Sequence, residues 1–305
     1  MERRVALCIP TWNGGKDFLE LAASIRRQKG LSFATLVIDS GSTDGTLEVA
    51  RRNGFRVCAI DGKTFDHGGT RQQGCEWLSD AEIVVFLTQD AILAKESSLA
   101  DLAACFAEPA VGLAYGRQLP RNNAGPFSAH ARLFNYPPQR QVRRKEDSEQ
   151  MGLKAAFASD SFAAYRQTAL AEVGGFPSKV ILGEDMLVAA KLLLADWQVV
   201  YCAEAEVYHS HEYTLQQEFR RYFDTGVFHT REAWLKATFG AAEGEGARFV
   251  QSEIRYLWNH GYGRLLPEAL LRTIVKYAGY KAGTWERLWP VHWKRKWSMH
   301  KNFWR

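Results

Sequence analysis

Short clusters of acidic and polar side chains follow apolar runs directly in this chain. The first cluster begins at Asp39, after the apolar residues 36–38, and continues as Ser-Gly-Ser-Thr-Asp-Gly-Thr. Ligands of open α/β sheets bind beyond the carboxyl ends of the strands, so a carboxylate here suits a nucleotide's ribose or base edge. The segment has neither the Lys of a P-loop nor a G-x-G-x-x-G motif. The alternative is an ordinary strand-to-helix turn in which Asp44 caps the helix.

A second cluster, Thr88-Gln89-Asp90, follows the continuous apolar run of residues 83–87. Such a run is typical of a strand that is buried on both faces. A carboxylate at the end of a central strand is poorly placed for packing, but it can bind a divalent cation that also contacts a diphosphate. The alternative for Asp90 is a helix cap or a turn residue.

The third cluster combines the glycine-rich residues 174–177 with Gly183-Glu184-Asp185. Glycines let the backbone approach a ligand closely. The two carboxylates open a predicted helix, where the N-terminal dipole stabilises them as anions. A base that deprotonates a hydroxyl nucleophile requires such a positioned carboxylate. The alternative is that Glu184 and Asp185 supply only favourable charge at a helix start.

The fourth cluster holds His209 and His211, directly after another predicted strand. A neutral imidazole can complete a cation site with Asp90. We expect the two side chains to diverge if the strand continues, so that only one of them is a ligand.

The composition is that of a soluble globular enzyme. The 305 residues, 46% hydrophobic and 24% charged, suit one large domain or a domain with an appendage. The five cysteines are scattered and form no C-x-x-C pair, which favours free thiols in a reducing compartment over disulfides or a zinc site. The sequence shows no signal-peptide pattern at its start, and no apolar run reaches the roughly 18–20 residues that span a bilayer.

Strand and helix patterns alternate through the first third of the chain. Apolar strand patterns cover residues 5–9, 36–38, 56–60 and 83–87, and helical patterns cover residues 16–29, 46–53 and 69–78. This order predicts an α/β fold with a doubly wound, mostly parallel sheet. Further strands are expected at residues 157–165 and 199–207, and further helices at residues 184–196, 216–236 and 248–260.

Two segments have a different character. Residues 120–151 hold four prolines and a basic run, which predicts a long surface excursion that is either a lid, an acceptor-contacting loop or a disordered insertion. Residues 264–305 hold ten Lys or Arg and two Glu, a net charge of +8, together with five of the ten tryptophans. Basic residues among aromatic ones suit a membrane interface. A tryptophan-rich helix packed on the domain is the alternative, and no nucleic-acid recognition motif accompanies the basic residues.

Taken together, the clusters resemble the inverting GT-A glycosyltransferases of family two, over residues 4–213. The resemblance rests on the order and spacing of Ile9-Pro10-Thr11-Trp12-Asn13, the segment 39–46, Gln89-Asp90, Gly174-Gly175-Phe176, Glu184-Asp185 and His209. It implies a GT-A (Rossmann-like) domain over residues 1–215. A basic, tryptophan-rich helical region over residues 216–305 would be associated with the membrane or the acceptor.

The resemblance also implies a donor-binding role for several residues. Asp39 would contact the nucleotide base near Pro10 and Thr11, and Gln89 would lie in the same donor site. Asp90 would be the last acid of the family's Asp-x-Asp metal motif. Thr88 replaces the first acid of that motif here, which leaves one carboxylate and makes His209 more important as a ligand of Mg²⁺ or Mn²⁺.

A catalytic role is implied for Asp185, which would deprotonate the acceptor hydroxyl. That hydroxyl would attack the anomeric carbon in a single displacement that inverts its configuration, while the cation neutralises the departing diphosphate. Glu184 and His211 are implied to lie close by, toward the acceptor.

The stretch Phe65-Asp66-His67-Gly68-Gly69-Thr70-Arg71 narrows the expectation to one donor sugar. Gly68 and Gly69 precede a helix and offer N–H groups to a phosphate. Arg71 can bind a diphosphate bidentately, and Asp66 and His67 can hydrogen-bond a sugar or base. This stretch and residues 298–304 resemble bacterial rhamnosyltransferases that use dTDP-L-rhamnose to build O-antigen and related polysaccharides.

The expected partners are therefore dTDP-L-rhamnose and a glycan acceptor linked to polyprenyl diphosphate. The expected location is cytoplasmic, peripheral on the inner face of the plasma membrane. Two other functions stay open: transfer of another sugar from a UDP or dTDP donor, and a non-catalytic nucleotide-sugar-binding module that has lost cation chemistry through Thr88.

Overall fold

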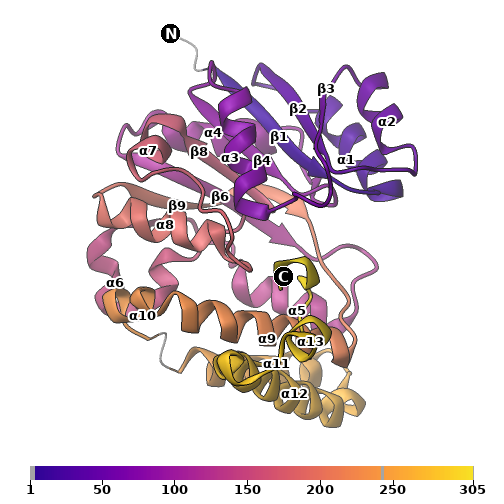
Figure 1. Cartoon of the computed structure of the whole chain (residues 1–305), viewed down its shortest axis with the longest axis vertical. Helices are drawn as coiled ribbons and strands as arrows, with labels where there is room; N and C mark the ends of the chain where they lie inside the picture. Colours follow the sequence, from indigo (N-terminus) through magenta and orange to yellow (C-terminus); the bar gives the residue numbers. More distant parts are fainter. Residues whose placement is uncertain (1–3, 242–243, 305) are drawn as a thin grey trace.

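The computed structural model describes residues 4–241 and 244–304 (Figure 1). Within these residues, strands form one mixed sheet in the order β3-β2-β1-β4-β8-β6-β9-β5, with β7 paired to β9. The strands are Val5–Thr11 (β1), Phe33–Asp39 (β2), Arg56–Ala59 (β3), Ile83–Leu87 (β4), Ile92–Leu93 (β5), Val111–Leu119 (β6), Gln141–Arg143 (β7), Phe162–Arg166 (β8) and Gln198–Tyr208 (β9).

The first half of the sheet is parallel and the second half is mixed. β1 pairs in parallel with β2 and β4, and β2 pairs in parallel with β3. β8 is antiparallel to both β4 and β6, whereas β6 and β9 are parallel. The predicted doubly wound, mostly parallel α/β sheet is thus confirmed, with antiparallel pairs at β5, β7 and β8 in addition.

Helices cover both faces of the sheet, because successive strand residues point to opposite faces. Leu7 and Ile9 pack with α1, α2 and α4 on one face, and Cys8 packs with α3, α7 and α8 on the other. These helices are Gly15–Arg26 (α1), Thr46–Arg52 (α2), His67–Trp77 (α3), Ser98–Ala104 (α4), Gln167–Glu172 (α7) and Glu184–Leu194 (α8).

A second helical layer lies below the sheet in Figure 1 and continues the same core. Its helices are Leu215–Arg231 (α9), Ala233–Phe239 (α10), Glu245–Asn259 (α11), Leu266–Thr284 (α12) and Val291–Trp297 (α13). α9 and α12 pack at very close range. A Cβ atom on Gly279 would lie 2.4 Å from the carbonyl oxygen of Phe219, and one on Gly283 would lie 2.0 Å from that of Phe223. Only glycine therefore allows this approach.

The segment 120–151 is more ordered than the sequence suggested. It contains the helices Pro126–Asn135 (α5) and Ser148–Met151 (α6) and the strand β7. Pro126 is compatible with α5 because it occupies the first turn, where its missing N–H has no helical partner to lose. The proline content was therefore misleading as an indicator of a loop. β6 and α12 are further elements that the sequence analysis did not identify.

Candidate functional site

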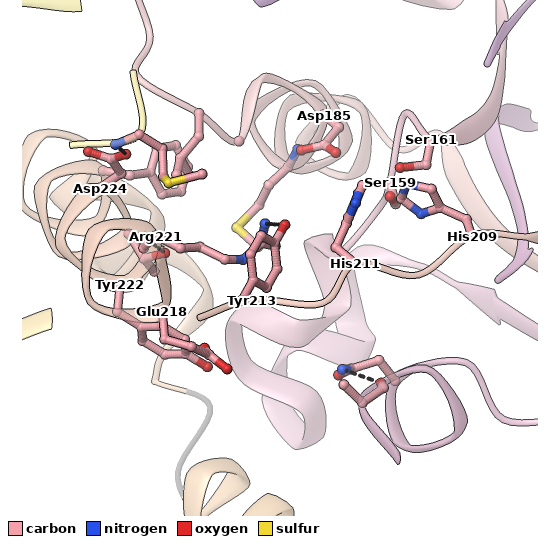
Figure 2. A pocket seen from close by; sticks show the side chains of 18 of the residues that line it. Ser159, Ser161, Asp185, His209, His211, Tyr213, Glu218, Arg221, Tyr222 and Asp224 are labelled. Carbon is pink, nitrogen blue, oxygen red and sulfur yellow. Dashed lines mark hydrogen bonds between the residues drawn. The ribbon is translucent and has the colours of Figure 1, made fainter. Parts of the chain in front are cut away.

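A cavity of about 710 Å³ separates the carboxyl edge of the sheet from the second helical layer. Figure 2 shows Asp185, His209 and His211 on one side of this cavity and Arg221, Tyr222 and Asp224 of α9 on the other. Three of the sequence clusters therefore meet in one place: Asp90 from the second, Asp185 from the third, and the two histidines from the fourth.

Asp39 lies beside Thr11, as the parallel pairing of β1 and β2 requires. Its carboxylate is only 1% exposed and accepts hydrogen bonds from Thr11 Oγ1 at 2.9 Å, Gly41 N at 2.9 Å, Ser42 N at 2.8 Å and Ser42 Oγ at 2.5 Å. Asp39 therefore shapes the turn after β2. Neither Asp39 nor Pro10 nor Thr11 is among the described residues that line the cavity, and their contact with a base stays a prediction.

Asp44 and Gln89 form hydrogen bonds between neighbouring loops. Asp44 accepts from Gly15 N at 2.8 Å and from Thr46 Oγ1 at 2.6 Å, next to the start of α2. Gln89 exchanges two hydrogen bonds with the backbone of Trp12, at 2.9 and 3.1 Å. These contacts hold the loops after β1, β2 and β4 in register along one edge of the sheet.

The residues at the start of α3 are engaged in contacts within the protein and are less available to a ligand than expected. Asp66 is the N-cap of α3, and it accepts from Gly69 N at 2.7 Å and from Lys179 N at 3.1 Å. A Cβ atom on Gly68 would lie 1.9 Å from the carbonyl oxygen of Pro177. Asp66, Gly68 and Gly69 therefore pack α3 against the glycine-rich loop, which differs from the expected contacts with phosphate and sugar.

Arg71 also differs from the expectation that it binds a diphosphate. Its side chain is 6% exposed, with Nε 2.9 Å from Asp160 Oδ2 and Nη1 2.8 Å from Glu184 Oε1. Nη1 donates in addition to the carbonyl oxygen of His67 at 3.0 Å. Two buried carboxylates already neutralise this guanidinium. Arg71 therefore holds Asp160 and Glu184 in place behind the cavity wall and does not line the cavity. Glu184 is thereby assigned to this ion pair.

Asp185 lies on the first turn of α8 and lines the cavity. Its Oδ2 accepts from Asp160 N at 3.2 Å, and its Oδ1 accepts from its own helix at Met186 N. Burial, followed by the negative charges of Asp160 and Glu184, raises the pKa of Asp185 to about 8. This carboxyl group therefore has the proton affinity of a base that works near neutral pH.

Asp90, His209 and His211 form a cluster whose ligand atoms all lie within 4.8 Å of one another. His209 Nε2 lies 3.4 Å from Asp90 Oδ2, and His211 Nε2 lies 3.6 Å from the same oxygen. The expectation that only one histidine faces Asp90 is wrong. β9 ends at Tyr208, and side chains two residues apart would share a face even in a continued strand.

The protonation states of this cluster suit a cation. Burial lowers the pKa of His209 and His211. Burial alone would raise the pKa of Asp90, but the hydrogen bond and charges of the histidines outweigh it and hold this pKa well below its usual value. The carboxylate of Asp90 is thus ionised at neutral pH, as a cation requires of an acidic ligand.

The far wall of the cavity comes from residues that the sequence analysis did not select. The buried Asp224 of α9 accepts from Met299 N at 2.8 Å. His300 lies edge-on to His67, with ring centroids 5.2 Å apart. Residues 299 and 300 thus form part of the wall of the site. Only the resemblance of residues 298–304 to rhamnosyltransferases pointed to this segment.

The tryptophans of the C-terminal region divide into packed and exposed ones. Trp297 contacts Phe223, Trp289 and Trp293, and Trp304 is buried beside Phe223. Trp285 and Trp293 are exposed. No helix within residues 4–241 and 244–304 is long and apolar enough to cross a bilayer.

Comparison with known proteins agrees with this geometry. Two relatives match almost the whole chain. The O-antigen chain rhamnosyltransferase RfbN of Salmonella typhimurium is 45% identical over 303 residues, which cover 99% of this chain and 96% of RfbN. The O-antigen chain rhamnosyltransferase WbaN of Salmonella anatum is 42% identical over 98% of this chain and 95% of WbaN.

Solved structures share the fold at low sequence identity. The mannosyltransferase PcManGT from Pyrobaculum calidifontis, solved with GDP-Man and Mn²⁺, superposes with a TM-score of 0.64 at 18% identity and covers 94% of this chain and 88% of its own. TarS 1–349 of S. aureus gives a TM-score of 0.55 at 17% identity, with 93% and 91% coverage. Residues 6–174 match glycosyl transferase family 2. The expected family is thus confirmed, and the chain belongs to glycosyl transferase family 2.

Proposed function

We propose that this protein transfers L-rhamnose from dTDP-L-rhamnose to a hydroxyl group of a glycan acceptor, with inversion in a single displacement. The support is the match of two O-antigen chain rhamnosyltransferases along nearly the full chain. The observation that carries the chemistry is a base and a cation site in one cavity: Asp185 at one place, and Asp90 with two histidines at another.

In this proposal Asp185 takes the proton of the acceptor hydroxyl as that oxygen attacks the anomeric carbon. The raised pKa of Asp185 matches this task, since the carboxylate gains a proton readily. The proton affinity of this base is set by burial and by the charges of Asp160, Glu184 and Arg71. Arg71 pairs with both of these carboxylates and does not line the cavity. The proposal retains the predicted contact of Asp39, Pro10 and Thr11 with the nucleotide base, at the turn after β2 and outside the lining of the cavity.

Asp90, His209 and His211 would hold a divalent cation, which supplies positive charge to the departing diphosphate. One carboxylate and two imidazoles favour Mn²⁺ over Mg²⁺, because Mg²⁺ prefers oxygen ligands and retains its water. The loss of the first acid of the motif at Thr88 is therefore compensated by a second histidine. This donor set argues against a module that has lost its cation site.

Donor turnover tests the activity. Purified protein with Mn²⁺ would be incubated with dTDP-L-rhamnose, other dTDP-sugars, UDP-sugars and GDP-sugars, and release of the nucleoside diphosphate would be measured. We expect dTDP-L-rhamnose to be consumed fastest. Consumption of a UDP-sugar without turnover of dTDP-L-rhamnose would replace the proposed donor. A protein that binds donors without turning any over, with or without lipid-linked glycans, would be a binding module.

The proposal includes an acceptor linked to polyprenyl diphosphate and a position at the inner face of the plasma membrane. The support is the outward face of α12, where large apolar side chains recur at helical spacing and Lys281 lies over the ring of Tyr277. Glycines hold the inner face against α9, so the large side chains point outward. The exposed apolar residues of this helix are Leu270, Leu271, Ile274 and Tyr277, and Trp258, Trp285 and Leu288 are further exposed apolar residues of the C-terminal region. Such a face suits the interfacial region of an anionic membrane.

Point substitutions test this surface better than truncation, because the end of the chain forms part of the core and the cavity. A variant with Leu270→Ser, Ile274→Ser and Tyr277→Ser should sediment less with anionic liposomes while donor turnover persists. Leu19→Ser on α1 removes an equally exposed leucine from another surface and serves as the control. Unchanged sedimentation of the triple variant would contradict the assignment.

A further inference from the structure

Gln118 is a buried amide of β6 that connects three parts of the site. It is 1% exposed. Its Oε1 lies 2.8 Å from His209 Nδ1 and also accepts a hydrogen bond from Arg132 Nη1. Its Nε2 donates to Ser159 Oγ at 2.9 Å. One side chain therefore contacts a proposed cation ligand, an arginine of α5 and a serine that lines the cavity.

Arg132 fixes the orientation of this amide. A guanidinium can only donate, so the group that faces Arg132 must be the amide oxygen. The same oxygen faces His209 Nδ1, and therefore Nδ1 must carry a proton and donate it. Nε2 is then the ring nitrogen that remains for a cation. Gln118 thus selects the tautomer of His209 that can bind a cation through Nε2.

The other ring nitrogen of His209 is directed at the cation cluster. His209 Nε2 lies 3.4 Å from Asp90 Oδ2, and His211 Nε2 lies 3.6 Å from the same oxygen. Gln118 therefore holds the ring from the Nδ1 side and aims Nε2 at the place where Asp90 and His211 meet.

Arg132 differs from Arg71 in its surroundings. Arg71 is neutralised by two carboxylates, whereas the hydrogen bond recorded for the guanidinium of Arg132 goes to the neutral amide of Gln118. Arg132 lines the cavity, its Nε is buried without a hydrogen-bond partner within the described part of the chain, and its charge reaches His209 and His211. A guanidinium that lines a cavity and has no carboxylate partner within the described residues is available to an anionic ligand.

We infer that Gln118 is a positioning residue that orients His209 and Arg132 together, and that Arg132 binds the diphosphate of the nucleotide beside the cation. The cation-binding imidazole and the anion-binding guanidinium share one amide oxygen, so their spacing is fixed. This inference rests on the proposed function for the presence of a diphosphate. Arg132 thus binds the diphosphate, the role that the sequence had suggested for Arg71.

The first test measures Mn²⁺ binding by electron paramagnetic resonance, with the full-length protein and no nucleotide. Gln118→Met removes both polar groups at similar volume and should weaken Mn²⁺ binding by roughly 10- to 100-fold. Gln118→Glu keeps an acceptor for His209 and Arg132, and it should bind Mn²⁺ within a few-fold of the wild type. Wild-type affinity in Gln118→Met, or equal losses in the two variants, would overturn the positioning role.

The second test measures binding of dTDP, UDP and GDP with Mn²⁺ by titration calorimetry. Arg132→Met should weaken whichever nucleoside diphosphate binds best by about 10- to 100-fold, as the loss of a charge-assisted contact does. It should weaken the corresponding monophosphate much less. Arg117→Met is the control, because Arg117 pairs with Glu206 and does not line the cavity. An unchanged diphosphate affinity in Arg132→Met would overturn its role.

The two proposals fail in different ways. If UDP or GDP binds best, the rhamnose donor is wrong, while a loss of that affinity in Arg132→Met still supports the diphosphate contact. If dTDP binds best and Arg132→Met binds it like the wild type, the donor class stands and the contact is wrong.

Discussion

Two groups on the same side of the cavity differ in their electrostatics: at its histidine end Asp90 lies beside two imidazoles, and at its carboxylate end Asp185 lies beside two carboxylates. The histidines hold the pKa of Asp90 well below its usual value against the effect of burial. Burial and the charges of Asp160 and Glu184 raise the pKa of Asp185 to about 8. Two aspartate side chains therefore differ in state: Asp90 is an anion, and Asp185 is a proton acceptor near neutral pH.

This contrast separates the two roles without reference to a bound ligand. Carboxyl groups whose environments displace their pKa values in opposite directions identify different tasks in one site. The histidine end is suited to a cation and the departing diphosphate. The carboxylate end is suited to the proton of the incoming hydroxyl. Four predictions test the contrast, in order of decreasing expected effect.

The largest effect is expected at the base. Asp185→Asn should lower kcat by about 100- to 10,000-fold, the usual contribution of general base catalysis. Binding of the nucleoside diphosphate with Mn²⁺ should change little, because the cation ligands are elsewhere. Transfer assays and calorimetry measure the two quantities. A variant with wild-type kcat would exclude Asp185 as the base.

Asp90→Asn should act on the cation end alone. It removes the one carboxylate of the cluster, so Mn²⁺ affinity should fall by more than the roughly 10- to 100-fold loss that follows removal of a ligand's hydrogen-bond partner. Electron paramagnetic resonance measures this affinity. Asp80→Asn, on the exposed surface after α3, is the control. If Asp90→Asn retained full Mn²⁺ affinity, the cation would have to bind elsewhere.

The pH dependence of kcat should report the carboxylate end. Below the raised pKa of Asp185, kcat should fall by about tenfold per pH unit, because the base is protonated. Asp160→Asn removes a negative charge beside Asp185, so the acidic limb should move to lower pH. Asp80→Asn should leave the limb in place. Movement to higher pH in Asp160→Asn would reverse the electrostatic account.

The smallest effect concerns stability. The folded protein retains the proton of Asp185 up to about pH 8, whereas the unfolded chain loses it near pH 4. The wild type should therefore lose stability as pH rises through this window. For each pH unit of this window, Asp185→Asn should flatten the trend by about 1 kcal/mol, or roughly 2–4 °C in Tm. Thermal unfolding from pH 5 to 8 would show this, and a steeper decline in the variant would contradict it.

The sequence by itself determined the parallel part of the sheet and the residues at its carboxyl edge. Asp90 and His209 were recognisable because each follows an apolar strand closely, and Asp185 was recognisable because it opens a helix after a glycine-rich segment. The excursion at residues 120–151 was not recognisable as the source of α5, because its prolines lie at element ends.

Only the tertiary structure decided how the charged groups are paired. Arg71 and Glu184 are 113 positions apart, and Gln118 and His209 are 91 apart. Local patterns give no information on such contacts, because the sequence does not show which arginine a buried carboxylate neutralises. The fold pairs Arg71 with the carboxylates beside Asp185 and leaves Arg132 facing the cavity. It also brings residues 299 and 300 into the wall of the site. The sequence thus named the chemical groups, and packing between distant segments decided their partners.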